Sequence, residues 1–204
     1  MKEIYFITAT NTDVGKSYTS EVFLNYFAKQ NKKVGYFKPI ETAVKDIPID
    51  GTKLLKIAQT LNKNFQVTID DIVPYQFSLP AAPFVASNAQ HIDIKLILSK
   101  ITYLLKFCDI LIIEGAGGLM VPINQNYFMI DLIKDINPTN TFLVSSSQLG
   151  SINDTLLSQK LLEQYQIKYN WYINLYKDKN NFFDITFPFY KAYYDKIEFV
   201  QDFL

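Results

Sequence analysis

The residues that most constrain the fold lie at the start of the chain, where a short apolar run leads through a polar turn into a helical pattern. Residues 4–8 fit a strand, and Gly15, Lys16 and Ser17 then open a helix. Such a turn points successive backbone N–H groups at one spot and adds the positive end of the helix dipole. The pattern predicts a phosphate-binding loop, with Lys16 on the phosphates and the Ser17 hydroxyl placed to ligate Mg²⁺. The alternative is an ordinary glycine turn followed by a solvated lysine.

The rest of the chain alternates apolar runs of strand length with helical patterns. Continuous apolar strands separated by helices are typical of a parallel sheet covered on both faces. We therefore expect an α/β, three-layer, P-loop NTPase-like fold with a mostly parallel sheet and helices on both faces. Ligands of such sheets bind at the carboxyl ends of the strands, where each motif below falls. Strands are expected at 4–8, 34–37, 110–113, 141–145 and 169–174, and helices at 17–30, 51–61, 94–107, 128–136 and 152–165.

Composition limits the classes of partner. The 204 residues suit one domain, 1–204, that can bury a substantial core. A formal net charge of zero argues against nucleic acid or an anionic membrane. All 20 basic residues are lysine, so no arginine finger can come from this chain, and phosphate charge must be met by Lys, Mg²⁺ and backbone amides. No apolar run approaches a membrane span and no signal peptide is recognisable, so a cytoplasmic location is expected.

A second motif follows the apolar run 110–113, which ends in Glu114 and passes into Gly115, Ala116, Gly117 and Gly118. A buried strand that ends in a carboxylate has the form of a Walker B element, in which the acid holds Mg²⁺ or its water shell. The small residues after it let backbone approach a ligand closely. Many buried strands end in an acid, but beside the phosphate loop the pattern predicts a nucleotide site.

Two further charged residues are expected near the phosphate loop. Lys38 ends the strand at 34–37, and Pro39 stops that strand and fixes the direction of the loop. Lys38 is either a second cation for the γ-phosphate or a carbamate, or a solvated lysine at a strand end. Asp50 precedes a helical stretch and is a plausible N-cap, and a cap carboxylate that faces the phosphates could also serve Mg²⁺.

Two other strand ends carry polar residues. Residues 145–153 follow a strand and open a helix, whose free N–H groups could hold a carboxylate. Helix capping by Ser147 or Ser151 is the alternative. Asn174 ends the last clear strand, where its amide could pair with a base edge or serve as an ordinary turn residue.

In the order of its motifs the chain resembles the dethiobiotin synthetase family, over residues 4 to about 175. The resemblance implies an ATP-dependent ligase domain that closes the ureido ring of dethiobiotin from 7,8-diaminononanoate and CO₂, with ATP and Mg²⁺. The substrate amine takes up CO₂ to form a carbamate, ATP phosphorylates it, and the second amine displaces phosphate. The motifs are Thr-Asn-Thr-Asp-Val-Gly-Lys-Ser, Phe-Lys-Pro-Ile-Glu-Thr, Pro80-Ala81-Ala82-Pro83, Glu-Gly-Ala-Gly-Gly and Leu149-Gly150-Ser151-Ile152-Asn153.

The resemblance also implies roles for individual residues. Catalysis would rest on Thr12, Lys16 and Lys38, which would stabilise the carbamate and the transferring phosphoryl group. Mg²⁺ would be organised by Ser17, Asp50 and Glu114. The nucleotide would further contact Asp13, Val14, Gly15, Tyr18, Gly115, Ala116, Gly117, Asn174 and Pro188.

The diamine site would be lined by Thr42 and by Pro80 and Ala81 of the 80–83 turn. In the family, the segment that matches Leu149, Gly150, Ser151, Ile152 and Asn153 comes from the other subunit and binds the substrate carboxylate. A homodimer with active sites shared across the interface is therefore implied. One departure concerns Ala9, which stands where the family commonly has glycine and would be strained at a positive φ.

The competing interpretation is a nucleotide-switch ATPase of the partition or septum-positioning type, which shares the expected fold. Such proteins carry an extra lysine near the start of the phosphate loop, where this chain has Thr10 and Asn11. Some end in a basic membrane helix, whereas the helix expected at 189–204 is slightly acidic. An amide-forming synthetase of the corrin pathway would usually carry a further domain, and a small-molecule kinase would usually show an arginine-rich lid.

Overall fold

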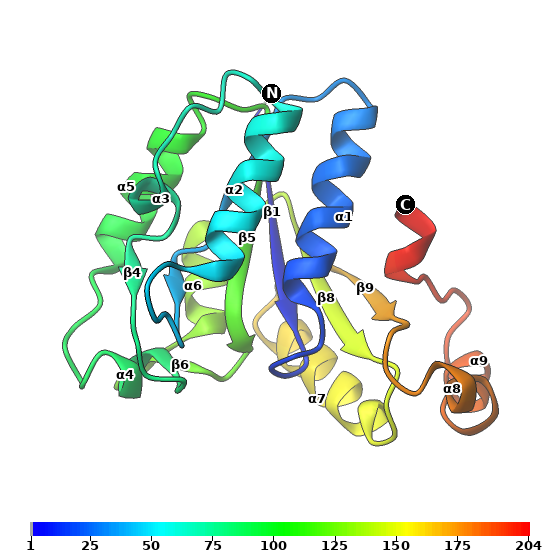
Figure 1. The fold of residues 1–204 in the computed structure, drawn as a ribbon. Helices are drawn as coiled ribbons and strands as arrows, with labels where there is room; N and C mark the ends of the chain where they lie inside the picture. The colour runs from blue at the N-terminus through cyan, green and yellow to red at the C-terminus, as the bar shows by residue number, and fades with distance from the viewer. Residues whose placement is uncertain (1) are drawn as a thin grey trace.

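A computed structural model describes residues 2–204, and a five-stranded parallel sheet forms its centre (Figure 1). Every neighbouring pair of strands in this sheet is parallel. The strands, in spatial order, are β2 (Val34–Phe37), β5 (Ile110–Gly118), β1 (Glu3–Ala9), β8 (Asn140–Ser146) and β9 (Tyr169–Asn174). All five predicted strands are confirmed. The strand β5 extends beyond the predicted end because its pairing with β1 continues to Ala9 and Gly118.

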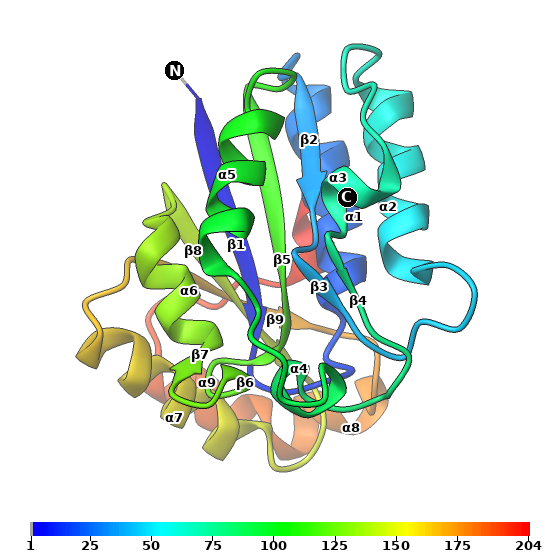
Figure 2. The same ribbon diagram turned by 90° about the vertical axis from the view of Figure 1, so that its left-hand side faces the viewer.

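Helices cover both faces of the sheet, which gives the predicted three layers (Figure 2). The helix α6 buries the apolar face that its sequence period predicts, with Met129, Ile130, Leu132 and Ile133. On one face lie α1 (Lys16–Lys29) and α2 (Ile49–Leu61), and on the other α5 (Ile94–Leu104), α6 (Met129–Ile136) and α7 (Ser151–Gln164). These are the five helices that the sequence predicts. Among residues 2–204, no helix combines the length and apolar character needed to cross a bilayer.

Shorter elements connect these layers, and none was predicted. Each has at most seven residues, too few to show a hydrophobic period. They are β3 (Ile40–Glu41), α3 (Ile69–Ile72), β4 (Tyr75–Gln76), α4 (Pro83–Ala86), β6 (Pro122–Asn124), β7 (Tyr127–Phe128), α8 (Lys179–Ile185), α9 (Phe187–Tyr193) and the 3₁₀ helix η1 (Val200–Phe203).

The C-terminal prediction of one helix over 189–204 is wrong. The helix α9 ends at Tyr193, and the chain then runs extended to η1, which packs beside α1 (Figure 1). The Phe203 ring lies 4.9 Å from that of Phe23, and Phe199 forms a parallel bridge with Ile173 on the edge strand β9. Aromatic burial against the sheet therefore overrides helical continuation in this segment.

The topology brings the motifs to one end of the sheet. The central strand β1 has β5 on one side and β8 on the other, and the chain leaves it first toward β2 and later toward β8. In a parallel sheet this reversal opens a crevice at the carboxyl ends of the strands. Ala9 lies in β1 and has no positive φ, so the strain considered for it does not arise; the left-handed residues of the loop are Asp13 (φ 56°) and Gly15 (φ 102°).

Candidate active site at the phosphate loop

A pocket of about 1320 Å³ opens at the carboxyl ends of β1, β2 and β5. Most of the residues predicted for the site line it, although they come from segments far apart in the sequence. These residues are Thr12, Asp13, Gly15, Lys16, Ser17, Tyr18, Lys38, Thr42, Asp50, Pro80, Ala81, Glu114, Gly115, Ala116, Gly117 and Asn174. The structure thus joins the predicted phosphate, metal and diamine segments in one cavity.

Gly15 shapes the phosphate loop. Its φ of 102° is a conformation that side chains rarely adopt, and an added Cβ would lie 2.1 Å from Asn174 Nδ2. Gly15 is also the N-cap of α1, and no side chain caps that helix. The first turn, Lys16 to Tyr18, lines the pocket, so its backbone N–H groups and the positive helix end remain available to an anion.

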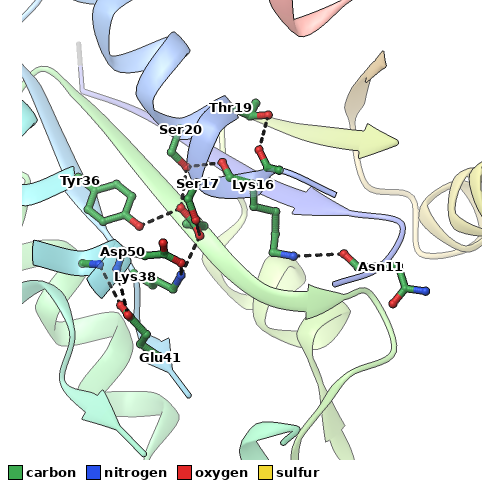
Figure 3. Close-up of polar contacts among 12 residues, drawn as sticks. Asn11, Lys16, Ser17, Thr19, Ser20, Tyr36, Lys38, Glu41 and Asp50 are labelled. Atoms are coloured by element: carbon green, nitrogen blue, oxygen red, sulfur yellow. Dashed lines mark hydrogen bonds and ion pairs between the residues drawn. The ribbon is translucent and has the colours of Figure 1, made fainter. Parts of the chain in front are cut away.

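Glu114 is the centre of a polar network, whose donors Ser17, Ser20, Tyr36 and Lys38 are labelled in Figure 3. It is only 1% exposed. Its Oε1 accepts hydrogen bonds from Ser17 Oγ at 2.8 Å and Lys38 Nζ at 2.9 Å. Its Oε2 accepts from Ser20 Oγ and Tyr36 OH, both at 2.9 Å. Four donors fix the orientation of this buried carboxylate and satisfy its hydrogen-bonding capacity.

Ser20 and Tyr36 were not predicted. Ser20 lies one helical turn after Lys16, and Tyr36 lies two residues before Lys38 on the same side of β2, so the helix and strand periods could have indicated both. Burial and the neighbouring Glu114 carboxylate raise the pKa of Tyr36 well above its ordinary value. Tyr36 therefore stays a hydrogen-bond donor to Glu114.

Lys38 bridges two carboxylates. Its Nζ lies 2.6 Å from Asp50 Oδ2 and 2.9 Å from Glu114 Oε1, and the side chain is 8% exposed. Burial alone would lower the pKa of Lys38, but the charges of Glu114 and Asp50 raise it above the ordinary value. Burial likewise opposes ionisation of Asp50, yet Lys38 keeps the pKa of that carboxyl low. Lys38 and Asp50 therefore face each other as an ion pair.

The predicted N-cap role of Asp50 is wrong. Pro48 occupies the N-cap of α2, and Asp50 lies in the first helical turn. Glu41 from β3 provides the cap instead, since its Oε1 accepts from Asp50 N–H at 3.1 Å and its Oε2 from Gly51 N–H at 2.9 Å (Figure 3). The Asp50 carboxylate therefore does not cap the helix and pairs with Lys38 instead.

Lys16 is buried as well, but no carboxylate forms an ion pair with it among residues 2–204. Its Nζ donates to the Asn11 carbonyl at 3.2 Å (Figure 3). Burial lowers the pKa of Lys16 to about 8, against the opposing effect of Glu114. An incoming phosphate would provide the missing negative charge.

Asn174 is committed to contacts within the chain. Its Nδ2 donates to the Val14 carbonyl at 2.9 Å, and its Oδ1 accepts from Gln201 Nε2 at 2.9 Å. Gln201 Oε1 in turn accepts from Leu175 N–H at 3.2 Å. Gln201 was not predicted because no motif surrounds it and its contact with β9 depends on the C-terminal packing. The amide pair therefore ties the phosphate loop to the C-terminal segment.

The remaining predicted residues lie outside the pocket within one chain. Leu149 is 79% exposed, and Gly150 is the N-cap of α7 with nothing within 4 Å of an added Cβ. No side chain caps α7: Ser147 Oγ donates to the Lys177 carbonyl, and Ser151 Oγ lies 3.2 Å from Tyr190 OH. The residues outside the lining are Val14, Leu149, Gly150, Ser151, Ile152, Asn153 and the exposed Pro188.

The donor set fits a hard divalent cation. The carboxylates of Asp50 and Glu114 meet at the Lys38 ammonium, Ser17 Oγ donates to Glu114, and oxygen donors are those that Mg²⁺ prefers. Across the described part of the chain, no cluster of three or more His, Cys, Asp or Glu side chains could hold a metal by itself. An ion bound here would complete its shell with phosphate oxygens and water, as Mg²⁺ does in nucleotide sites.

Comparison with known proteins narrows the class of protein to which this chain is similar. A protein family described as an AAA domain matches residues 3–173. The ATP-dependent dethiobiotin synthetase of Sulfurovum sp. (strain NBC37-1) is 49% identical over 188 residues, which covers 92% of this chain and 89% of that relative. The ATP-dependent dethiobiotin synthetase of Wolinella succinogenes is 36% identical over 189 residues, which covers 91% of this chain and 87% of the relative.

Solved structures agree on the fold. A plasmid partition protein from Borrelia burgdorferi superposes with a TM-score of 0.57 over 99% of this chain and 94% of its own. The identity is 12%, so this likeness shows the fold alone. The P-loop NTPase-like prediction is confirmed. The sequence similarity to dethiobiotin synthetases, which extends over most of the chain, separates this chain from the nucleotide-switch ATPases.

Proposed function

Because the chain belongs to the ATP-dependent dethiobiotin synthetase family, we propose that its lysines and carboxylates at the phosphate loop carry out that family's ring closure. The activity is the ATP-dependent formation of dethiobiotin from 7,8-diaminononanoate and CO₂. One amine attacks CO₂ and loses a proton, which gives a carbamate. A carbamate oxygen then attacks the γ-phosphorus and ADP leaves. The second amine attacks the activated carbonyl carbon and loses a proton, and phosphate leaves as the ring closes.

The observation that carries the assignment of roles is the convergence of Lys38, Glu114 and Ser17 within hydrogen-bond distance beside Lys16. Each early step builds negative charge, first on the carbamate and then on the transferring phosphoryl group. Lys38, Lys16 and Thr12 line the pocket where such charge would develop. Fixed cations in a dry pocket stabilise it more strongly than water does. These steps need neutral amines and positioning rather than a strong general base.

We assign Ser17, Asp50 and Glu114 as the residues that would hold Mg²⁺. When bound, the ion neutralises the β- and γ-phosphates. The nucleotide phosphates would lie along Asp13, Gly15 and Tyr18, with Gly115, Ala116 and Gly117 close by. Pro188 does not line the pocket, so we assign it no contact with the nucleotide.

We propose that the diamine occupies the end of the pocket lined by Thr42, Pro80 and Ala81. Its carboxylate needs a partner there, and a second subunit would supply Leu149 to Asn153 at the start of α7. The exposure of Leu149 and the open space around Gly150 support a homodimer with shared sites. Residues 1–204 would then act as one ligase domain, and we place the enzyme in the cytoplasm, where ATP is available.

The test of the metal assignment is Glu114→Gln, with turnover followed as Mg²⁺ is varied at fixed ATP and diamine. We expect turnover to fall about 100-fold, since a fixed charge at the reacting phosphate is lost. The matched control is Asp109→Asn at the opposite end of β5, where the Asp109 carboxylate pairs with Lys2 and accepts a hydrogen bond from Lys33 N–H. A Glu114→Gln enzyme with the Mg²⁺ response of the parent would refute the assignment.

A further inference from the structure

The buried carboxylate of Glu41 lies beside the site but has no part in the chemistry above. It is 6% exposed and lies on β3, three residues after Lys38. Both of its oxygens are used, one on Asp50 N–H and the other on Gly51 N–H. Glu41 therefore contacts the backbone of Asp50 while the Asp50 side chain contacts Lys38.

Helix α2 depends on this outside cap. The first N–H groups of a helix have no partner within it, and a side chain at the N-cap usually takes one of them. Pro48 has no side-chain acceptor, and its carbonyl accepts a hydrogen bond from Thr52 N–H at 2.9 Å. Glu41 thus supplies two acceptors and a negative charge at the positive end of α2.

The fit between Glu41 and α2 requires glycine at position 51. An added Cβ on Gly51 would lie 3.1 Å from Glu41 Oε2 and 2.4 Å from Val73 Cγ2. Any side chain there would push the helix start away from β3. The first turn of α2 is therefore seated directly on the Glu41 carboxylate.

Glu41 is itself held rigidly. Ile40 and Glu41 pair with Tyr75 and Gln76 of β4, and the Glu41 carbonyl accepts from Phe77 N–H at 2.9 Å. Lys38 N–H donates to the Ile72 carbonyl at 2.9 Å. The segment from α3 to β4 thus fixes Lys38 directly, through the Ile72 carbonyl, and fixes Asp50 indirectly, through Glu41.

We propose that Glu41 is a positioning residue that sets the Mg²⁺ affinity of the site without touching the ion. By capping α2 it fixes the Asp50 carboxylate beside Lys38 and opposite Glu114. This inference rests on the proposed role of Asp50 in Mg²⁺ binding. Loss of the cap frees the first turn of α2 and the Asp50 side chain moves with it.

The test is a double-mutant cycle of Glu41→Gln and Asp50→Asn, read out as Mn²⁺ affinity by electron paramagnetic resonance in enzyme saturated with a non-hydrolysable ATP analogue. Glu41→Gln should weaken Mn²⁺ binding about tenfold, the size typical for partners behind metal ligands. The double variant should bind Mn²⁺ no more weakly than Asp50→Asn alone, because Glu41 acts through Asp50. Saturating Mg²⁺ should restore turnover in Glu41→Gln.

The control is Asp93→Ala, which removes the side-chain N-cap of helix α5 at a position that does not line the pocket. It should lower the melting temperature and leave Mn²⁺ affinity unchanged. Parental Mn²⁺ affinity in Glu41→Gln, or effects that multiply in the double variant, would overturn the inference alone. Parental affinity in Asp50→Asn would overturn the metal assignment and the inference together. If Glu41→Gln does not fold, Glu41→Asp, which retracts the carboxylate by one methylene, replaces it.

Discussion

At the scale of single residues, the site depends on how buried charges are paired. Lys38 lies between Asp50 and Glu114, whereas Lys16 donates to the Asn11 carbonyl and pairs with no carboxylate of residues 2–204. The two lysines therefore differ in what they offer a substrate. We propose that the nucleotide phosphates supply the negative charge that Lys16 lacks. Lys38 is already oriented and charged, which suits a group that acts in the transition state.

Lys38→Ala should reduce turnover about 100-fold or more while the affinity for ATP changes only a few-fold, because the phosphate loop and Lys16 remain. Steady-state turnover and equilibrium ATP binding, measured on the same protein, check this. The control is Lys45→Ala, an exposed lysine on the loop before α2. Equal losses of turnover and ATP affinity would show that Lys38 only binds nucleotide.

Sequence reasoning finds residues that belong to a motif and misses those recruited by tertiary contact. Lys38 and Glu114 each directly follow an apolar run of strand length, so their common position at one edge of the sheet could be predicted. Glu41 and Gln201 could not, because their partners are a helix start nine residues away and the end of the last strand, respectively. No hydrophobic period or motif spacing in the sequence indicates such a tertiary contact.

At the scale of elements, long periodic segments were predictable and short capped ones were not. The five main strands and five helices carry apolar periods that fix their type. In contrast, α3 has four residues and is defined by reciprocal hydrogen bonds between Thr68 and Asp71. The start of α2 was misassigned because its cap comes from another element.

The capping box of α3 predicts a pH-dependent contribution to stability. Burial opposes ionisation of Asp71, but hydrogen bonds from Lys100 and Thr68 hold the pKa of its carboxyl below the ordinary value. A lowered folded-state pKa stabilises the fold above the unfolded-state pKa of about 4, and this contribution is lost as the pH falls through the folded-state value.

Asp71→Asn should therefore lower the free energy of unfolding by about 1 kcal/mol at pH 7, the scale of a partly exposed pair. The difference from the parent should shrink at pH 3. Urea unfolding of both proteins at the two pH values measures it. The control is Asp70→Asn in the same turn, where the Asp70 carboxylate accepts a hydrogen bond from the Gln76 side chain. A difference that is constant from pH 7 to pH 3 would contradict the assignment.

At the scale of the whole molecule, the pocket of one chain brings together the residues that we propose for the nucleotide and the diamine, but not the start of α7. Leu149 to Asn153 lie on the other side of the phosphate loop, next to a small pocket of about 110 Å³ lined by residues such as Thr10 and Leu149. A sequence can indicate that this segment binds a carboxylate only through its family resemblance. Which subunit it serves depends on assembly, which no local pattern encodes.

A shared site predicts that two inactive variants restore each other. Lys38→Ala removes the cation of its own pocket, and Leu149→Glu places a carboxylate against the partner's substrate. Equal co-expression should recover about a quarter of parental activity, since half of the dimers are mixed and each has one intact site. Isolation of the mixed dimer confirms assembly. An inactive mixed dimer would show that Leu149 serves its own chain.

The central claim is that the charged pocket at the phosphate loop joins CO₂ to a diamine at the expense of ATP. The most direct test is fixation of labelled bicarbonate into acid-stable product, with ATP and Mg²⁺, in the presence and absence of 7,8-diaminononanoate. We predict that label is incorporated only with the diamine and in step with ADP release. ATP hydrolysis at the same rate without the diamine, and no fixed label, would contradict the account.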